Sequence, residues 1–322
     1  MNDERTRYQA VNDEVFALYV AELYAEAVTE VHEAMPELPR YRSDLAHTAA
    51  CLRAASGDAQ GALDELRAAF DDGGWWHPRI LLDDDDLASL HGREGFAELV
   101  SLSRERADSA LDETSEPVIQ RPETTPRGLL VALHGAGDGA DDAADQWQAA
   151  VDAGFVLMAV ESSQRNTPTY RSWPDPSVAE RDIAAALASL PARDRSLPLV
   201  TAGFSAGGRQ ALRWALVGRP GTPVGFVVVA PAMEPEHLPS DDVVAAVRRQ
   251  VDGVIVAGKD DDEVGDGPMR THQALRQAGL ACRLDVVPDL GHTYPADFAS
   301  RLRAILDALV PSMPQSAERV IR

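Results

Sequence analysis

One stretch of the chain decides its fold: Leu197-Pro198-Leu199-Val200-Thr201-Ala202-Gly203-Phe204-Ser205-Ala206-Gly207-Gly208-Arg209-Gln210-Ala211-Leu212. An apolar run typical of a buried strand meets Gly-x-Ser-x-Gly, and helix-forming residues follow at once. This order predicts a nucleophile elbow, a tight strand-to-helix turn that exposes the Ser205 hydroxyl at a sheet edge. Gly203 and Gly207 allow the close approach of strand and helix that a Cβ would block. The pattern alone is weak, because it also fits a simple strand–turn–helix connection.

From Gly128 onward, apolar runs alternate with helical segments. The runs lack polar alternation, which is typical of strands buried on both faces. They comprise residues 129–133, 155–160, 197–202, 224–230, 253–257 and 281–287, and the helical segments include 179–190, 209–217 and 269–278. The pattern predicts an α/β fold, a doubly wound and mostly parallel sheet. In such sheets, ligands bind beyond the C-terminal ends of the strands.

The region before this sheet is predicted to be an all-helical domain covering residues 1–108. Apolar residues recur at helical spacing over residues 10–33, 44–56, 59–70 and 94–106. Residues 49–70 resemble a tetratricopeptide unit, because small residues lie where paired helices would touch and Gly57 turns the chain between them. This helical domain could recruit a protein partner.

Three prolines mark residues 109–127 as a linker, in which Val118-Ile119 could form a short edge strand. The catalytic domain then covers residues 128–322. Trp75-Trp76 could bind a ligand or a peptide, but packing between helices is the better interpretation. Asp83–Asp86 lacks the alternating ligands and the central glycine of a calcium loop, so a solvated turn or helix cap is expected there.

Composition limits the class of protein. The chain has 322 residues, 45% hydrophobic residues and a net charge of −22. Such negative charge repels phosphate backbones and anionic lipids, so nucleic acid is not expected as a partner. No run is long enough to span a membrane, and the N-terminus lacks the pattern of a signal peptide, so a cytoplasmic location is expected.

The cysteines and histidines suggest no metal. Cys51 and Cys282 lie in different predicted domains and in apolar segments, which favours buried free thiols over a disulfide. No group of Cys and His has the spacing of a zinc site, and neither a metal nor a cofactor is expected. Most histidines have no catalytic context, namely His32, His47, His77, His91, His237 and His272.

A glycine-rich turn, Leu133-His134-Gly135-Ala136-Gly137-Asp138-Gly139, follows the first long strand of the predicted sheet. Such a turn leaves backbone N–H groups unpaired. In a serine hydrolase this loop supplies half of the oxyanion hole, and the residue after the nucleophile supplies the other half, so the expected donors are the N–H groups of Ala136 and Ala206. A phosphate cradle is the alternative, but the Walker and dinucleotide patterns are absent. His134 is expected to fix the loop.

Two further clusters follow later strands. Asp260, Asp261 and Asp262 stand side by side after one strand, and any of them could orient a catalytic histidine, although a surface turn is the alternative. His292 follows the last strand in Gly-His-Thr, from where its ring can reach the serine. The order Ser, Asp, His is that of the α/β-hydrolases, which favours a catalytic role for His292 over that of a polar loop residue.

Residues 128 to about 310 resemble α/β-hydrolases of the phospholipase/carboxylesterase family, which includes acyl-protein thioesterases, with some likeness to dienelactone hydrolases. The resemblance rests on the motifs at residues 133–139, 173–175, 203–208, 258–261 and 291–293. In that family the acid is usually three residues after the glycine, which implies Asp261. The resemblance also implies a metal-independent esterase with a Ser-Asp-His triad. Ala206 departs from the usual Gln of the thioesterases, and the helical domain lies outside the minimal family.

The sequence therefore predicts a serine hydrolase that cleaves a small-molecule carboxylic ester or thioester through an acyl-enzyme. Ser205 is the nucleophile, His292 the base and Asp261 the acid. Arg171 and Trp173 lie where substrate-binding loops are expected, although Arg171 could instead pair with Asp175 or Asp182.

Two other functions stay open. One is a serine peptidase of prolyl oligopeptidase type, whose usual propeller is absent from this chain. The other is a non-catalytic partner-binding protein with a vestigial hydrolase domain. The acyl group, the leaving group and the oligomeric state do not follow from the sequence.

Overall fold

The computed structural model describes residues 2–110, 116–238 and 240–311, which fall into two compact units. The helical unit comprises residues up to 113 together with residues 164–171, and the sheet unit comprises residues 114–163 and those from 172 onward. The helical unit thus includes a segment from the middle of the predicted catalytic domain. Residues 111–115 of the predicted linker and 312–322 of the predicted catalytic domain lie outside the described residues.

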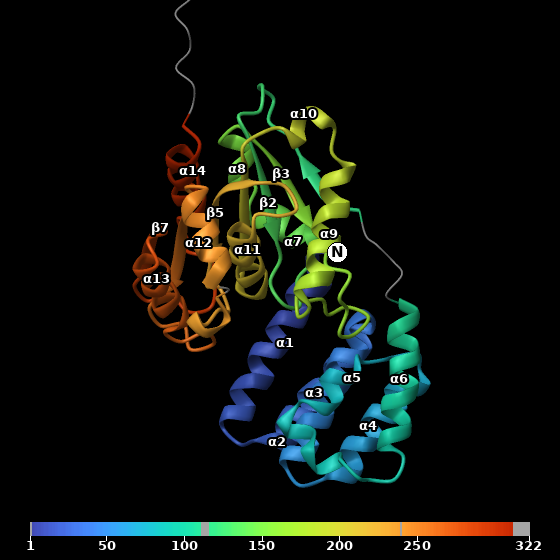
Figure 1. Ribbon diagram of the computed structural model, residues 1–322. Coiled ribbons are helices and arrows are strands. Elements are labelled where there is room, and N and C mark those ends of the chain that lie inside the picture. The colour runs from blue at the N-terminus through green and yellow to red at the C-terminus, as the bar shows by residue number, and fades with distance from the viewer. Residues whose placement is uncertain (1, 111–115, 239, 312–322) are drawn as a thin grey trace, which may run out of the picture. The chain divides into compact units, whose positions relative to one another are not determined.

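The helical unit is a series of short antiparallel helices. Its helices are α1 (Asn2–Val20), α2 (Tyr24–Ala34), α3 (Arg42–Ala55), α4 (Ala59–Asp71), α5 (Pro78–Leu82) and α6 (Phe96–Ala110), with 3-10 turns η1 (Met35–Glu37), η2 (Pro39–Tyr41) and η3 (Asp85–Leu90) (Figure 1). One apolar cluster joins α1, α2 and α3, and a second joins α3, α4 and α6. The α3–α4 hairpin turns at Gly57, as predicted for the segment that resembles a tetratricopeptide unit.

The single helix predicted over residues 10–33 is in fact two helices. Glu22 adopts φ 58°, and the N–H of Leu23 donates to the Leu18 carbonyl at 2.9 Å, which closes the end of α1. A left-handed residue at a helix end is usually Gly or Asn. Because neither is present here, the sequence pattern gave no sign of the break.

Two local interpretations from the sequence are confirmed in this unit. Trp76 is fully buried, and its indole N–H donates to the Ser43 carbonyl at 2.9 Å, so it packs between helices. Asp84 accepts a hydrogen bond from the N–H of Asp86 at 3.0 Å and thereby caps η3. The aspartate run is therefore a cap in this structure.

A buried carboxylate holds the segment from residues 164–171. Asp44, on α3, accepts hydrogen bonds from the hydroxyl of Thr167 at 2.6 Å and from the hydroxyl of Thr169. The N–H of His77 donates to the Asn166 carbonyl at 2.6 Å. Burial raises the pKa of Asp44, and the two threonine hydroxyls oppose this effect by stabilising the charged form.

The sheet unit is built on one mostly parallel sheet. Within the described residues, its strands are β1 (Val118–Gln120), β2 (Gly128–Leu133), β3 (Phe155–Val160), β4 (Leu199–Phe204), β5 (Pro223–Val229), β6 (Asp252–Gly258) and β7 (Ala281–Val287), in the order β1-β3-β2-β4-β5-β6-β7. β1 alone runs antiparallel, against β3, and it contains the predicted Val118-Ile119 edge strand. The doubly wound sheet and its strands are thus confirmed, with boundaries within two residues of those predicted.

Helices cover both faces of the sheet. One face carries α9 (Pro176–Ser189), α11 (Ser205–Val217), α12 (Ser240–Arg248) and α13 (Gly267–Gln277), and the other carries α7 (Ala140–Gln146), α8 (Ala149–Asp152) and α14 (Phe298–Leu309) (Figure 1). The short α10 (Ala192–Arg195) and η4 (Pro235–His237) lie in connections. In β2, Leu129 and Val131 face the first layer, and Leu130 and Ala132 face the second. All four are buried, which explains why the strand shows no polar alternation.

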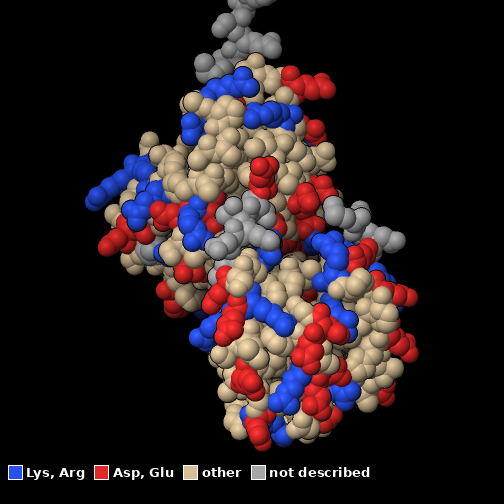
Figure 2. All heavy atoms as spheres, turned by 90° about the vertical axis from the view of Figure 1, so that its right-hand side faces the viewer, with Lys and Arg blue, Asp and Glu red and all other residues tan. Residues whose placement is uncertain are grey.

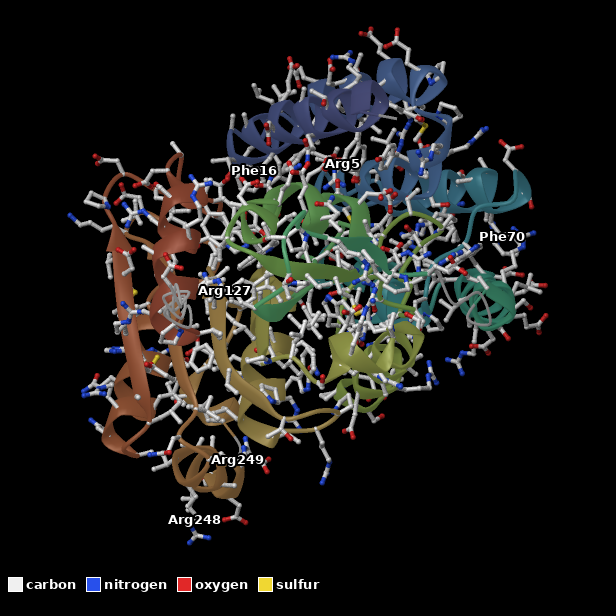
Figure 3. The ribbon with its side chains drawn as sticks, turned by 90° about the horizontal axis from the view of Figure 1, so that it is seen from above. Arg5, Phe16, Phe70, Arg127, Arg248 and Arg249 are labelled. Atoms are coloured by element: carbon white, nitrogen blue, oxygen red, sulfur yellow. The ribbon has the colours of Figure 1, made fainter. Side chains whose placement is uncertain are left out.

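An arginine closes the C-terminal end of α11. Arg249 donates to the carbonyls of Ala215 at 2.8 Å and Leu216 at 2.7 Å, and more weakly to Val217 at 3.4 Å. Figure 3 shows that its neighbour Arg248 points away from the rest of the unit. A cation at these carbonyls pairs helix acceptors that have no partner in the helix.

Surface charges, helix hydrophobicity and the two cysteines can be compared with the expectations from composition. On the face shown in Figure 2, acidic and basic side chains are interspersed over the helical unit. Among the described residues, no helix has both the length and the apolar character needed to cross a membrane. Both cysteines are free, but only Cys282 is buried; Cys51 is half-buried. Burial raises the pKa of Cys282 to about 12.

Candidate active site

The predicted elbow lies at the junction of β4 and α11. Ser205 is the first residue of α11 and has φ 51°, a left-handed conformation that is rare for a residue other than glycine. A Cβ on Gly203 would lie 2.5 Å from the Gly207 backbone, and one on Gly207 would lie 2.3 Å from the carbonyl oxygens of Leu133 and His134. Strand and helix therefore meet so closely that only glycine fits at both positions, as the sequence predicts.

An aspartate and a histidine meet at the ends of β6 and β7. The Nδ1 atom of His292 lies 2.9 Å and 3.1 Å from the two carboxylate oxygens of Asp261. An ionised carboxylate only accepts hydrogen bonds, so Nδ1 carries the ring proton and donates a hydrogen bond to Asp261. Nε2 is then left with a lone pair. The side chain of Asp261 is 1% exposed and that of His292 is 11% exposed.

Backbone contacts select Asp261 among the three adjacent aspartates. The N–H of Asp260 donates to the Leu290 carbonyl at 3.0 Å, which joins the loop after β6 to the loop after β7. A Cβ on Gly258 would lie 2.2 Å from the same carbonyl oxygen, so this approach requires glycine. Asp260 and Asp262 are exposed, whereas Asp261 points inward to His292.

Aromatic side chains support the histidine, and the sequence analysis did not find them. The ring of Phe204, directly before Ser205, lies 4.9 Å from the His292 ring and stacks on Tyr294 at 4.8 Å between centroids. Trp147 donates its indole N–H to the Tyr294 hydroxyl at 3.1 Å. Burial raises the pKa of Tyr294, so the phenol stays neutral. These contacts join residues that no sequence motif relates.

The outer side of His292 faces a second carboxylate. Oε2 of Glu263 lies 3.6 Å from Nε2, and the Glu263 side chain is 72% exposed. Among the described residues, no hydrogen bond joins the Ser205 hydroxyl to His292. Ser205 directly follows Phe204, and the Phe204 ring contacts the His292 ring. Ser205 and His292 therefore lie at the same end of the sheet. Hydrogen bonds of this kind are often long until a substrate is bound.

The glycine-rich loop after β2 is fixed by its histidine, as predicted. Nε2 of His134 accepts a hydrogen bond from the N–H of Ser162 at 3.1 Å, and the indole N–H of Trp173 donates to the His134 carbonyl at 2.9 Å. Within the described part of the chain, the N–H groups of Ala136 and Ala206 have no backbone acceptor. Their role as donors to an oxyanion stays a prediction.

The two predicted substrate contacts lie in different units. Trp173 is 1% exposed, and in this position its indole supports the His134 loop. Arg171 belongs to the helical unit and is also buried. Asp175 caps α9 and Asp182 accepts hydrogen bonds from the N–H and hydroxyl of Ser163, and pairing of Arg171 with either carboxylate stays a prediction. Contact of Arg171 or Trp173 with a substrate stays a prediction.

Solved structures share the fold of this chain. An uncharacterized protein from Bacillus cereus ATCC 10987 has a TM-score of 0.54 at 23% identity, over 94% of this chain and 98% of that one. Esterase PE8 has a TM-score of 0.52 at 20% identity, over 61% of this chain and 100% of its own. Acyl-protein thioesterase 2 of Zea mays has a TM-score of 0.50 at 20% identity, over 61% of this chain and 99% of its own. A search of curated protein sequences found no match.

Family models match both parts of the chain. Residues 7–111 match a model described as the A/B hydrolase-like, N-terminal domain. Residues 124–293, more than half of the chain, match the model described as serine aminopeptidase, S33. That segment contains Ser205, Asp261 and His292. The chain belongs to this family of α/β-hydrolases, and the helical N-terminal domain of α/β-hydrolase-like proteins precedes its hydrolase domain.

Proposed function

We propose that the chain is a serine hydrolase that cleaves a carboxylic ester or thioester through an acyl-enzyme. The observation that carries the proposal is the hydrogen bond from His292 Nδ1 to Asp261, at the sheet edge where Ser205 opens α11 in a left-handed conformation. A buried carboxylate on Nδ1 fixes the tautomer that makes Nε2 a base. Membership of an α/β-hydrolase family supports the same chemistry.

In the proposed acylation step, the Ser205 hydroxyl attacks the carbonyl carbon of the substrate. His292 accepts the hydroxyl proton at Nε2, and Asp261 stabilises the imidazolium that forms. The carbonyl oxygen becomes an oxyanion and accepts hydrogen bonds from the N–H groups of Ala136 and Ala206. Loss of one such donor typically raises the barrier by about 3 kcal/mol.

His292 also moves the protons in the steps that complete acylation and then hydrolyse the acyl-enzyme. His292 returns its proton to the departing alcohol or thiol as the bond to the acyl carbon breaks. A water molecule attacks the ester on Ser205 while His292 accepts one of its protons. The second tetrahedral intermediate collapses, Ser205 regains its proton, and the carboxylic acid leaves.

The proposal is tested with Ser205→Ala and a fluorophosphonate probe. The unsubstituted protein is expected to hydrolyse p-nitrophenyl acyl esters and to be labelled at Ser205, and Ser205→Ala is expected to lose roughly 10⁴-fold or more in kcat. Circular dichroism and the melting temperature of both proteins control for folding. Full activity in Ser205→Ala would refute the mechanism. Absence of labelling and of turnover in the unsubstituted protein would favour a non-catalytic binding role.

A second candidate activity is hydrolysis of a peptide bond near an N-terminus. The family description as a serine aminopeptidase favours it, and the same triad can cleave amides. Matched aminoacyl p-nitroanilides and p-nitrophenyl esters distinguish the two. A higher kcat/KM for the anilide at equal acyl group would favour the peptidase, and turnover of the ester alone would favour the esterase.

A further inference from the structure

The helical unit contains a cluster of three metal-ligand residue types that the hydrolase site does not use. His47 and Cys51 lie one turn apart on α3, so their side chains share a face of the helix. Asp84 reaches the same place from the loop before η3. One ligand atom from each residue lies within 4.8 Å of the other two.

The distances between these atoms are close to those between the ligands of a tetrahedral ion. Nε2 of His47 lies 3.3 Å from Oδ2 of Asp84 and also 3.3 Å from the Ile80 carbonyl oxygen. Sγ of Cys51 is 3.5 Å from Oδ2 of Asp84 and 3.8 Å from each ring nitrogen of His47. Zinc bond lengths of about 2.0–2.3 Å with tetrahedral angles give ligand separations of about 3.3–3.6 Å. A charge-assisted hydrogen bond between His and Asp would instead be about 2.7–2.9 Å long.

Asp84 is oriented for this role by its own capping bond. Its Oδ1 accepts the N–H of Asp86 at 3.0 Å, and this bond leaves Oδ2 directed at Cys51 and His47. Hydrogen bonds that fix a ligand carboxylate are typical of metal sites. A neutral imidazole, a thiolate and a carboxylate would also balance the charge of a divalent cation.

The cluster opens on a pocket from which a fourth ligand can come. His47 and Cys51 line a pocket of about 420 Å³ between α1 and α3, together with Asp86 and with Tyr19 of α1. The Tyr19 hydroxyl donates to Asp86 at 3.5 Å, so polar side chains that can hold a water molecule lie beside the cluster. Three protein ligands with one open position are a common zinc arrangement.

We propose that His47, Cys51 and Asp84 bind a zinc ion in the helical unit, with water from the adjoining pocket as the fourth ligand. The thiolate excludes calcium and magnesium, which take oxygen ligands. The ion would tie α3 to the loop before η3, which lies over thirty residues later in the chain. The spacing of Cys and His residues in the sequence does not reveal this site, because its third ligand is a carboxylate that lies far away in the sequence.

The test is metal binding by the full chain after removal of metals with a chelator. One equivalent of Zn²⁺ is expected per chain, and Co²⁺ is expected to give a near-ultraviolet thiolate-to-cobalt absorption band that Zn²⁺ abolishes. Cys51→Ser is expected to lose this band, and Cys282→Ser, the matched control, to keep it. Asp84→Asn and His47→Gln are expected to weaken Zn²⁺ binding by at least about tenfold.

Three outcomes would overturn the proposal. Absence of the thiolate band in the unsubstituted protein does so alone, whatever the folding of the variants. Persistence of the band in Cys51→Ser, or its loss in Cys282→Ser alone, would place the thiolate elsewhere. Neither result depends on hydrolase activity, so the zinc proposal and the proposed function can fail separately.

Discussion

Substitution of Gly207 by alanine tests whether packing of α11 against β2 positions the candidate nucleophile. A Cβ at this position would lie 2.3 Å from the carbonyl oxygens of Leu133 and His134, whereas ordinary contact begins at 3.4 Å. Relief of this overlap requires a displacement of about 1 Å. Both oxygens belong to the backbone, so no side-chain rotation can supply it.

The displacement is expected to move α11 rather than β2. β2 is hydrogen-bonded between β3 and β4, and Ser162 and Trp173 fix His134 beyond its end. The N-terminus of α11, which carries Ser205 and Ala206, must therefore shift. Overpacking of this kind costs about 1–3 kcal/mol of unfolding free energy. A misplacement of about 1 Å at a reacting group costs about 10²-fold in rate.

The assay is steady-state hydrolysis of a p-nitrophenyl ester together with urea unfolding. Gly207→Ala is expected to lower kcat by about 10²–10³-fold and to lower the urea midpoint. Gly208→Ala is the matched control, because its Cβ would meet its nearest neighbours at 3.2–3.3 Å and needs a shift of only a few tenths of an ångström. An unchanged kcat and midpoint in Gly207→Ala would refute the idea that this contact holds Ser205 in place.

Three other predictions concern the acid, the buried carboxylate of the helical unit and the α11 cap. Asp261→Asn is expected to lower kcat by roughly 10³–10⁴-fold. Glu263→Gln, which removes only the charge of an exposed carboxylate 3.6 Å from Nε2, should change kcat by less than about fivefold, and equal losses would contradict the assignment. Burial raises the pKa of Asp44 in the folded protein above 3.8. The free energy of unfolding of the unsubstituted protein, relative to that of Asp44→Asn, should therefore fall as the pH rises from about 4 through the raised pKa. Above that pKa the difference should level off. Urea unfolding of both proteins from about pH 4 to pH 8 checks this, and a constant difference would argue against it. Arg249→Met should lower the unfolding free energy by about 1–3 kcal/mol. The control Arg248→Met, whose side chain points to solvent, should lower it by less than about 0.5 kcal/mol (Figure 3). Similar losses in both variants would show that the hydrogen bonds of Arg249 to α11 do not contribute to stability.

The sheet was predictable because its strands carry their own signal. Burial on both faces requires unbroken apolar runs in the inner strands. Each of the predicted runs became a parallel strand, including β7, which lies at the edge of the sheet and is only partly buried. Several helices carried no such signal. α8 has four residues and α7 has seven, which is too short for helical periodicity to stand out. The break at Glu22 was missed because its left-handed conformation occurs at a residue that is neither Gly nor Asn.

The candidate site was predictable where backbone geometry demands a residue type. Gly203, Gly207 and Gly258 occupy positions where any Cβ would meet backbone atoms, so the motifs around them appear in the sequence. The choice of Asp261 rested on a family resemblance. Its physical reason is the bond between the Asp260 N–H and Leu290, a contact between two loops that sequence spacing does not contain.

The contacts that escaped prediction all join side chains from distant parts of the chain. Phe204, Tyr294 and Trp147 meet only because β4, the loop between β7 and α14, and the C-terminal end of α7 converge at one end of the sheet. Asp44 likewise binds Thr167 across more than a hundred residues. A residue type that the backbone requires leaves a local pattern, whereas a side-chain contact can be made by many pairs of residues and leaves none. Predictions from the sequence therefore reached the α/β-hydrolase fold, and the contacts that would select a substrate, such as those predicted for Arg171 and Trp173, require binding experiments.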